Sequence, residues 1–447
     1  MIFIAWSSAS GLRAFPRTFE LEEDLMFRNS GSSAHVLPFL WHAIFLAAFL
    51  VAAVVAPASG QEKAKIRTIT AFIRLDSGQY KQQITDTLTM LRNAKARYGL
   101  AGYEVQTIRI TTQPFPEYTH GMSKQAALAL FHDLDALAKQ EDVSISIGPA
   151  LMNDKDDPGQ AELLEEILGL TSKLYGSVAI AGNDGVHWKS VHAAAGIIKY
   201  LEDHGDKGLG NFRFAAIASV QAYTPFYPAS YHEGLGHQFA IALESANVVA
   251  AVMAVQRDTE VTRQALISEL GLQARSVEDV ASKIDQDTGW TYMGLDLSPA
   301  PMKYASIGSA VAGFTGGRFG TSGTLTAVAT ITSALRDISV KKVGYSGVMM
   351  PVMEDTRLAQ LWGEGALTMD QLLAYSAVCG TGLDTIPLPG EVTTQQLERI
   401  LGDVATLSVK LSKPLSARLL PVAGAKAGDQ TSFDDPNLVN TVIQPLP

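Results

Sequence analysis

The chain has 447 residues, of which 47% are hydrophobic and 18% charged, so it is too long for a small module and too apolar for a disordered protein. Its formal net charge of −10 gives no electrostatic basis for binding nucleic acid. A single cysteine excludes an internal disulfide and a zinc site built from several cysteines.

Residues 1–60 have the pattern of an export signal. An unbroken apolar run spans 43–56, and small residues follow at the −3 and −1 positions of a cut before Gln61. The longer apolar segment 36–56 is long enough to span a membrane instead, as an uncleaved anchor. Both alternatives place the rest of the chain outside the cytoplasm, in the periplasm or the extracellular space. Contact with a membrane is expected only if the segment is not cleaved.

Strand-like and helix-like segments alternate from residue 66 onward. Strands are predicted at 66–75, 103–111, 143–147, 175–181, 212–219 and 247–254, and helices at 79–98, 123–139, 159–170, 187–202 and 236–245. Such alternation is typical of a parallel sheet with helices outside it. No linker interrupts the chain, so a single α/β domain is expected over 61–424. Residues 425–447 are polar and bounded by proline, which predicts an extended surface tail.

Ligands of parallel α/β folds bind at the carboxyl ends of strands, so the loops that follow strands are the candidate sites. One of them, 313–324 (GFTGGRFGTSGT), leads into an apolar helix. Backbone N–H groups around Gly317, Gly320, Ser322 and Gly323 could bind an anion there, and Arg318 could clamp it. The alternative is a tight turn that caps the helix.

A second candidate is the adjacent carboxylates of Glu354 and Asp355, in GYSGVMMPVMEDTR, where a predicted strand ends. The pair could coordinate a divalent cation or supply a general base. The alternative is the first turn of a helix, where the helix dipole favours acidic side chains.

A third candidate is Cys379, which precedes two glycines and Asp384 in VCGTGLDTIPLPGE. An accessible thiol in such a loop could act as a nucleophile or an acid/base group. The alternative is that the lone cysteine is a small buried hydrophobic residue.

Two further loops contain polar side chains suited to substrate binding. PFYPASYHEGLGH carries Tyr231 and His232; its two histidines are five residues apart and cannot share a helical face, which disfavours zinc. GLDLSPAP places Asp296 at the end of a predicted strand, where it either meets substrate or makes an ordinary turn before Ser-Pro.

Five segments, taken in order, resemble a prokaryotic family catalogued as domain of unknown function seven-one-one. They are GLDLSPAP, GRFGTSGT, SGVMMPVMEDTRLA, AVCGTGLDTIPLPGE and KLSKPLSARLLPV, and the resemblance covers roughly residues 66–424. It implies a ten-stranded α/β barrel similar to that of pyruvate formate-lyase and anaerobic ribonucleotide reductase. It implies no activity, since a fold does not define a function.

The resemblance also bears on single residues. Cys379 and Asp384 fall in the family's cysteine–glycine–leucine–aspartate stretch, and Glu354 and Asp355 in its proline–valine–x–glutamate–aspartate stretch. Ser322 stands where the family has a histidine. The C-terminal glycyl-radical motif of the enzymes with the related barrel has no counterpart here, so radical chemistry is not expected.

The sequence therefore predicts an exported enzyme that acts on a small anionic metabolite, a carboxylate or a phosphate. The glycine loop with Arg318 would bind the anion, and Cys379 with the nearby carboxylates would perform the chemistry. A divalent cation at Glu354 and Asp355 and a homo-oligomeric state are left open. The alternative is a non-catalytic protein that binds or senses the same kind of solute, and a third interpretation is a structural partner.

Overall fold

The computed structural model describes residues 63–446, which belong to one compact unit. The predicted leader, residues 1–60, lies outside the described residues. Between 63 and 446, no helix is both long and apolar enough to cross a membrane.

Strands and helices alternate through most of the chain. The strands are β1 (Lys65–Ile73), β2 (Val105–Thr112), β3 (Ser144–Pro149), β4 (Leu174–Gly182), β5 (Gly185–Val186), β6 (Phe214–Ala218), β7 (His237–Glu244), β8 (Thr291–Asp296), β9 (Gly382–Pro389) and β10 (Leu415–Val422). The helices are α2 (Tyr80–Leu100), α3 (Pro116–Thr119), α4 (Lys124–Gln140), α5 (Gly159–Leu170), α6 (Trp188–Asp203), α7 (Ala246–Val255), α8 (Thr259–Thr288), α9 (Ile307–Thr315), α10 (Thr324–Asp337), α11 (Thr356–Gly363), α12 (Met369–Ser376) and α13 (Thr394–Leu411), with a 3₁₀ helix at Asp206–Arg213.

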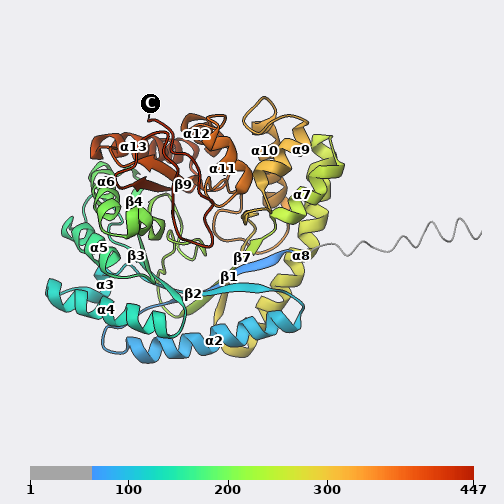
Figure 1. Cartoon of the computed structure of the whole chain (residues 1–447). Helices are drawn as coiled ribbons and strands as arrows, with labels where there is room; N and C mark the ends of the chain where they lie inside the picture. Colours follow the sequence, from blue (N-terminus) through green and yellow to red (C-terminus); the bar gives the residue numbers. More distant parts are fainter. Residues whose placement is uncertain (1–62, 447) are drawn as a thin grey trace, which may run out of the picture. The chain divides into compact units, whose positions relative to one another are not determined.

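The ten strands form one mixed sheet in the order β8-β7-β1-β2-β3-β4-β6-β10-β9, with β5 paired to β4. The five central strands are parallel, whereas β7 is antiparallel to β1 and β10 is antiparallel to β6. The expectation of a parallel sheet is therefore only partly right. The connection 219–236, which leads from β6 to β7, contains no helix, whereas the crossover between parallel strands usually contains one. Figure 1 shows the sheet curving, with helices along its outer side.

The two outermost strands of the path, β8 and β9, do not pair with each other. Residues 341–352 lie between them without being one of the ten strands. The Leu295 N–H donates to the Lys341 carbonyl at 2.8 Å, and the Val352 N–H donates to the Asp384 carbonyl at 2.9 Å. This segment thus contacts both edges of the sheet, and the predicted strand that ends at Glu354 is irregular instead.

The predictions for residues 236–254 are reversed: the first half is strand β7 and the second half is helix α7. In β7 the large buried side chains Phe239, Ile241 and Leu243 recur at the two-residue period of a strand, and the small Ala240 between the first two is buried as well. In α7 the buried Val248, Val249 and Val252 follow helical spacing. The valine content of this segment favours a strand locally, but α7 packs against helices α8 and α9, and this tertiary context decides for the helix.

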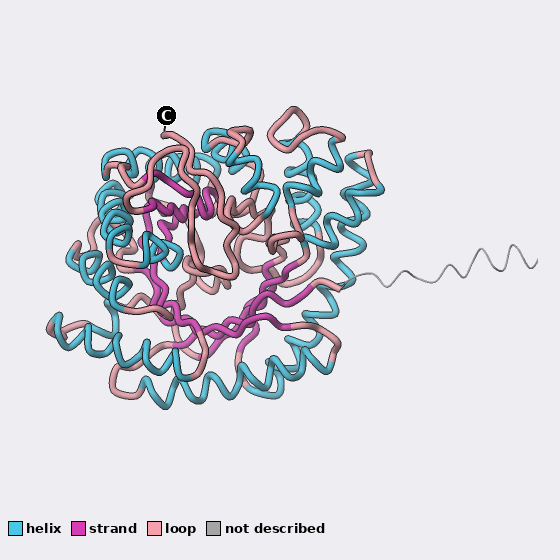
Figure 2. Tube along the Cα trace, viewed as in Figure 1, coloured by secondary structure: helices cyan, strands magenta, loops and turns pink. Residues whose placement is uncertain are grey.

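The two faces of the sheet differ in polarity. Helices cover the outer face with apolar side chains, as predicted for Ile84, Leu88 and Leu91 of α2, which are all buried. On the inner side, the Thr111 hydroxyl lies 2.8 Å from that of Ser230, and the Ser146 hydroxyl donates to the Ser230 carbonyl at 2.8 Å. Figure 2 shows loops occupying this inner side. Hydrogen-bonded polar side chains therefore lie on the inner side of the curved sheet.

The C-terminal segment, residues 425–446, is extended but differs from the predicted surface tail because part of it is buried. Phe433, Leu438 and Ile443 are 6%, 6% and 1% exposed. The Val439 N–H donates to the Met353 carbonyl at 2.6 Å. In Figure 1 this segment, in dark red, runs across the inner side of the sheet.

Candidate functional site

A cavity of about 570 Å³ extends from the inner side of the sheet to the exposed side chains of Arg92 and Asp142. Its volume is within the size range of small-ligand sites. Its lining includes six basic and three acidic side chains: Arg67, Arg92, Lys95, Arg109, Lys173 and Arg418, with Glu141, Asp142 and Glu354. We call it the arginine cavity. Several lining residues stand at the beginning of central strands, including Thr107 of β2 and Ser144 of β3. The cavity therefore lies toward the amino ends of these strands, and not at the carboxyl ends where the site was expected.

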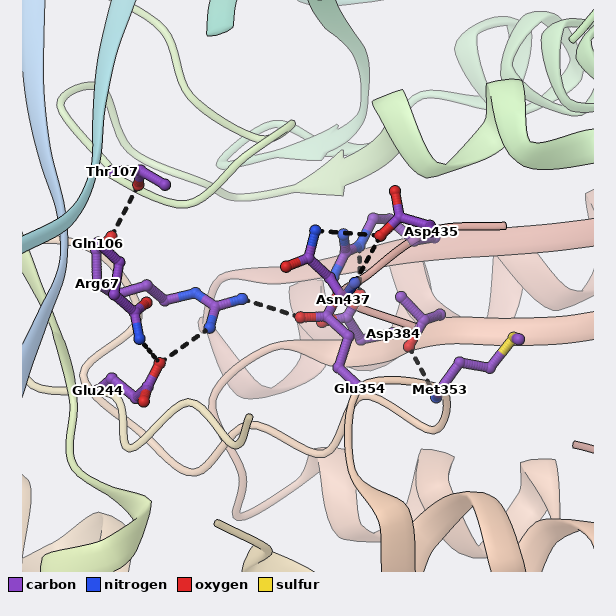
Figure 3. Close-up of polar contacts among 11 residues, drawn as sticks. Arg67, Gln106, Thr107, Glu244, Met353, Glu354, Asp384, Asp435 and Asn437 are labelled. Carbon is purple, nitrogen blue, oxygen red and sulfur yellow. Dashed lines mark hydrogen bonds and ion pairs between the residues drawn. The ribbon is translucent and has the colours of Figure 1, made fainter. Parts of the chain in front are cut away.

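A buried ion-pair network forms one wall of the arginine cavity. Arg418 Nη2 lies 2.5 Å from Glu354 Oε1, and Arg418 Nε lies 2.5 Å from Asp384 Oδ1. The other Glu354 oxygen accepts a hydrogen bond from Arg67 Nη2 at 2.9 Å. Figure 3 shows Arg67 between Glu244 and Glu354. Glu354 thus joins two arginines that come from β1 and β10.

The two predicted carboxylates of this network differ in their affinity for a proton. Burial on its own would raise the pKa of Glu354, but Arg418 and Arg67 together lower it, so Glu354 stays ionised. Burial raises the pKa of Asp384, and Arg418 opposes this only in part. Asp384 Oδ2 is also buried without a hydrogen-bond partner. Asp384 is therefore the better suited of the two to take up a proton.

Arg67 and Arg109 keep hydrogen-bond donors that the protein does not use. Arg67 Nη1 lies 3.7 Å from Glu244 Oε2 and is buried without a hydrogen bond. Arg109 faces no carboxylate at ion-pair distance among residues 63–446, and its guanidinium lies 4.9 Å from the centre of the Tyr227 ring. Burial and then the charge of Arg67 lower the pKa of Arg109 to about 10. Arg109 therefore remains cationic at neutral pH.

Asp296 lies close to this pair of arginines. A second cavity of about 20 Å³, large enough for one water, is lined by Arg67, Arg109 and Asp296 among others. The Asp296 oxygens accept hydrogen bonds from the backbone N–H groups of Tyr345 and Ser346, both at 3.1 Å, and from Ser298. Asp296 thus makes the turn described by the alternative interpretation and ties it to the segment between β8 and β9.

Asp355 caps a helix. Its Oδ1 accepts hydrogen bonds from the N–H groups of Arg357 and Leu358 in the first turn of α11, at 2.9 and 3.1 Å, and from the Ser306 hydroxyl at 2.6 Å. Because Glu354 binds arginines, the two adjacent carboxylates do not converge on one point. No group of three or more His, Cys, Asp or Glu side chains within residues 63–446 is arranged to hold a metal ion. Asp355 therefore caps the N-terminus of α11, in line with the alternative interpretation of an acidic side chain at the start of a helix.

Cys379 lies in the hydrophobic core, where it is 1% exposed. Its carbonyl accepts a hydrogen bond from the buried ammonium of Lys413, and the next N–H, of Gly380, donates to the Val348 carbonyl at 2.6 Å. The thiol does not line the arginine cavity. Its position matches the alternative of a buried hydrophobic residue.

The glycine loop lies on the surface. Gly317, Arg318, Ser322 and Gly323 are exposed and Gly320 is half-buried. Gly323, in the left-handed conformation, precedes the first residue of α10. None of these residues lines the arginine cavity, so the structure does not bring the loop together with Glu354 and Asp384.

Tyr231 and His232 belong to the connection 219–236 and are both buried. The Tyr231 hydroxyl donates to the Val220 carbonyl at 3.0 Å, and His232 Nε2 lies 2.8 Å from Gln238 Oε1. Burial lowers the pKa of His232, which keeps the imidazole neutral at pH 7. Neither side chain lines the arginine cavity, and both hold the connection in place.

Sequence reasoning did not single out Arg67, Arg109 or Arg418. Each stands in a strand that is otherwise apolar or rich in β-branched and hydroxyl residues: KIRTITAFI, VQTIRITT and LSARLLPV. A charged side chain within a buried strand needs a partner, since an isolated buried charge is costly. An arginine within an otherwise uncharged strand was therefore the sequence feature that could have indicated the site.

These observations define an α/β protein with a ten-stranded mixed sheet and a cavity lined mainly by basic side chains. The family described as Uncharacterised ACR (DUF711) matches residues 59–435, and the chain belongs to this family. The resemblance inferred from the five motifs is thereby confirmed.

Curated relatives come from archaea and bacteria and are UPF0210 proteins. One from Pyrobaculum aerophilum is 32% identical over 347 residues, which cover 73% of this chain and 76% of the relative. One from Methanosarcina barkeri is 27% identical and covers 86% of this chain and 91% of the relative. One from Listeria monocytogenes is 26% identical and covers 83% and 89%. Their names state no activity.

Proposed function

We propose that the protein binds a small anionic metabolite, a carboxylate or a phosphate, in the arginine cavity and acts on it as an enzyme. The observation that carries this proposal is the presence of two guanidinium groups, those of Arg67 and Arg109, with unused donors in one cavity. Guanidinium groups bind carboxylate and phosphate with paired hydrogen bonds.

The ion-pair network supports the proposal by holding one of these arginines in place. Arg67 is fixed through Glu354, which is fixed in turn by Arg418. The guanidinium of Arg418 lies 4.9 Å from the ring centre of Phe212 and 5.2 Å from that of Phe226, which restricts its movement. Glu354 is therefore a positioning residue. The second oxygen of Asp384 has no hydrogen-bond partner, but Asp384 would act on a ligand only through Arg418, to which it is bound.

A non-catalytic binding or sensing protein is the second candidate, and one observation favours it. The candidate nucleophile Cys379 is buried outside the arginine cavity, and both oxygens of Glu354 are bound to arginines. Asp384 does not itself line the cavity and touches it through Arg418. Turnover separates the two candidates.

Two further proposals concern the architecture and the location of the protein. We propose that residues 341–352 complete the sheet as a closed barrel of the pyruvate formate-lyase and ribonucleotide reductase kind; the backbone hydrogen bonds to both edge strands support this. We also propose that the protein is exported. The family match begins at residue 59, next to the expected cut before Gln61, which supports a leader separate from the family domain.

The test is a thermal-shift screen of the purified protein against small carboxylates and phosphates, with and without Mg²⁺, followed by turnover assays on every hit. A ligand that binds only the folded protein raises Tm by mass action. A hit that is consumed supports the enzyme, and a hit that is not consumed supports the binding protein. Cys379→Ser is expected to bind and turn over like wild type, since the thiol lies outside the cavity. The absence of any anion-dependent shift would contradict the proposal.

A further inference from the structure

A residue close to the C-terminus lines the arginine cavity. Asn437 is part of the cavity lining together with Glu354 and Arg418, although it is distant from both in the sequence. Figure 3 shows Asn437 and Asp435 in the view of the same network. The segment that the sequence assigned to the surface therefore forms part of the wall of the candidate site.

The position of Asn437 is set by a hairpin-like fold of the C-terminal segment. The two arms are joined by the hydrogen bonds from the Thr431 N–H to the Thr441 carbonyl and from the Gly428 N–H to the Ile443 carbonyl, at 2.9 and 2.8 Å. Phe433 and Leu438, which flank the tip, are buried. A tip anchored on both sides can hold a side chain at a defined place in the cavity wall.

The hydrogen bonds at the tip determine which atom of Asn437 is left for a ligand. Its backbone N–H and its Nδ2 both donate to Asp435 Oδ1, at 2.8 and 3.1 Å. A carboxylate only accepts hydrogen bonds, so the amide nitrogen must face Asp435. The Oδ1 of Asn437 is then the atom free to accept a hydrogen bond.

We propose that Asn437 is a specificity-determining residue that accepts a hydrogen bond from the ligand through Oδ1, while Arg67 and Arg109 bind the anionic group. The ligand class is a small carboxylate or phosphate that also carries a hydroxyl or amino group away from the anion. This inference rests on the proposed function. The family match ends at residue 435, so Asn437 lies beyond the matched region.

The first experiment measures access to the cavity without a known ligand. A Ser144→Cys reporter stands beside Arg109 in the pairing of β2 with β3, and the buried Cys379 contributes little background. Labelling rates are measured with an anionic and a cationic methanethiosulfonate reagent. Faster labelling by the anionic reagent, reversed or abolished in a second variant that also carries Arg109→Met, is the result expected from the proposed function. Equal rates, or faster cationic labelling, would contradict the anion site itself.

The second experiment tests Asn437. Thermal shifts are measured with ω-hydroxy- and ω-amino-alkanoates of about three to six carbons, each against the alkanoate of the same length. We expect at least one donor-bearing probe to bind about tenfold more tightly than its partner, the size of one well-placed hydrogen bond. That preference should vanish in Asn437→Leu and persist in Asn153→Ala, which changes an asparagine outside the cavity. Anionic preference in the labelling experiment without any donor preference here would overturn the role of Asn437 and leave the anion site standing.

Discussion

Replacing Glu354 by glutamine removes the charge that joins Arg67 to Arg418. Glu354 is 2% exposed, and each of its oxygens contacts one arginine. Removing one partner of a buried pair typically costs about 3–5 kcal/mol because the remaining charges stay buried without compensation. Arg418 keeps Asp384, and glutamine keeps some hydrogen bonding, so the expected cost is about 3 kcal/mol.

This cost converts into a measurable change in melting temperature. The entropy of unfolding is about 2 cal/mol/K per residue, or about 0.8 kcal/mol/K for residues 63–446, so Tm should fall by about 4 °C at pH 7. The matched control is Glu117→Gln. Glu117 pairs with Arg74 at 3.0 Å, but the two side chains are 43% and 47% exposed. A pair of this kind contributes about 0–1 kcal/mol.

The difference in Tm should depend on pH in a defined direction. The two arginines hold the pKa of Glu354 below its usual value of 4.5, so the folded state binds a proton here less readily than the unfolded chain. The charge therefore stabilises the fold fully above about pH 4.5, and this contribution is lost as the pH falls through the folded-state pKa. Glutamine does not titrate, so the gap between wild type and Glu354→Gln should be widest above pH 5 and narrow below pH 4.5.

Differential scanning fluorimetry between pH 3.5 and 8 measures both effects. The reasoning is refuted if Glu354→Gln lowers Tm no more than Glu117→Gln at pH 7, or if the gap widens on acidification.

Three other substitutions test the structure more locally. Asp355→Ala should lower Tm by about 1–3 °C through loss of the helix cap, and adding Mg²⁺ should not change this difference in Tm from wild type. A difference in Tm that appears only with Mg²⁺ would indicate a cation site at Asp355. Gly382→Ala should destabilise the protein far more than Gly365→Ala. Both glycines have positive φ, but a Cβ added at Gly382 would lie 2.5 Å from a backbone oxygen, whereas a Cβ added at Gly365 would meet nothing. Equal Tm values for the two variants would contradict the packing of β9 against β10. Cys379 should react with a thiol reagent only after denaturation, and stoichiometric labelling of the native protein would show that the core around it is wrong.

Much of the fold could be predicted because its signals are local. Helix α5 has the predicted bounds 159–170, and β1 and α2 differ from prediction by one or two residues at most ends. The failure at β7 and α7 arose where local composition and tertiary packing disagree. The antiparallel placement of β7 and β10 depends on which strand each one joins, and no local pattern carries that information.

The candidate site could be predicted only in part. Glu354 and Asp384 were recognised as candidate carboxylates, but the arginine that binds both of them is 64 and 34 residues away in the sequence. Cys379 and the loop of Arg318 were selected for local composition, whereas their roles depend on exposure. Burial removes the thiol from the surface, and the loop lies apart from the carboxylates.

The central claim is that an anion binds in the arginine cavity and not at the surface glycine loop. The most direct measurement compares the Tm shift caused by one anionic hit in wild type, Arg109→Met and Arg318→Met. At a concentration of 100 Kd, binding stabilises the fold by about 2.7 kcal/mol, which is about 3 °C for this chain. The account predicts that Arg318→Met retains this shift and that Arg109→Met loses it. A shift that survives in Arg109→Met and disappears in Arg318→Met would contradict the account and return the site to the glycine loop.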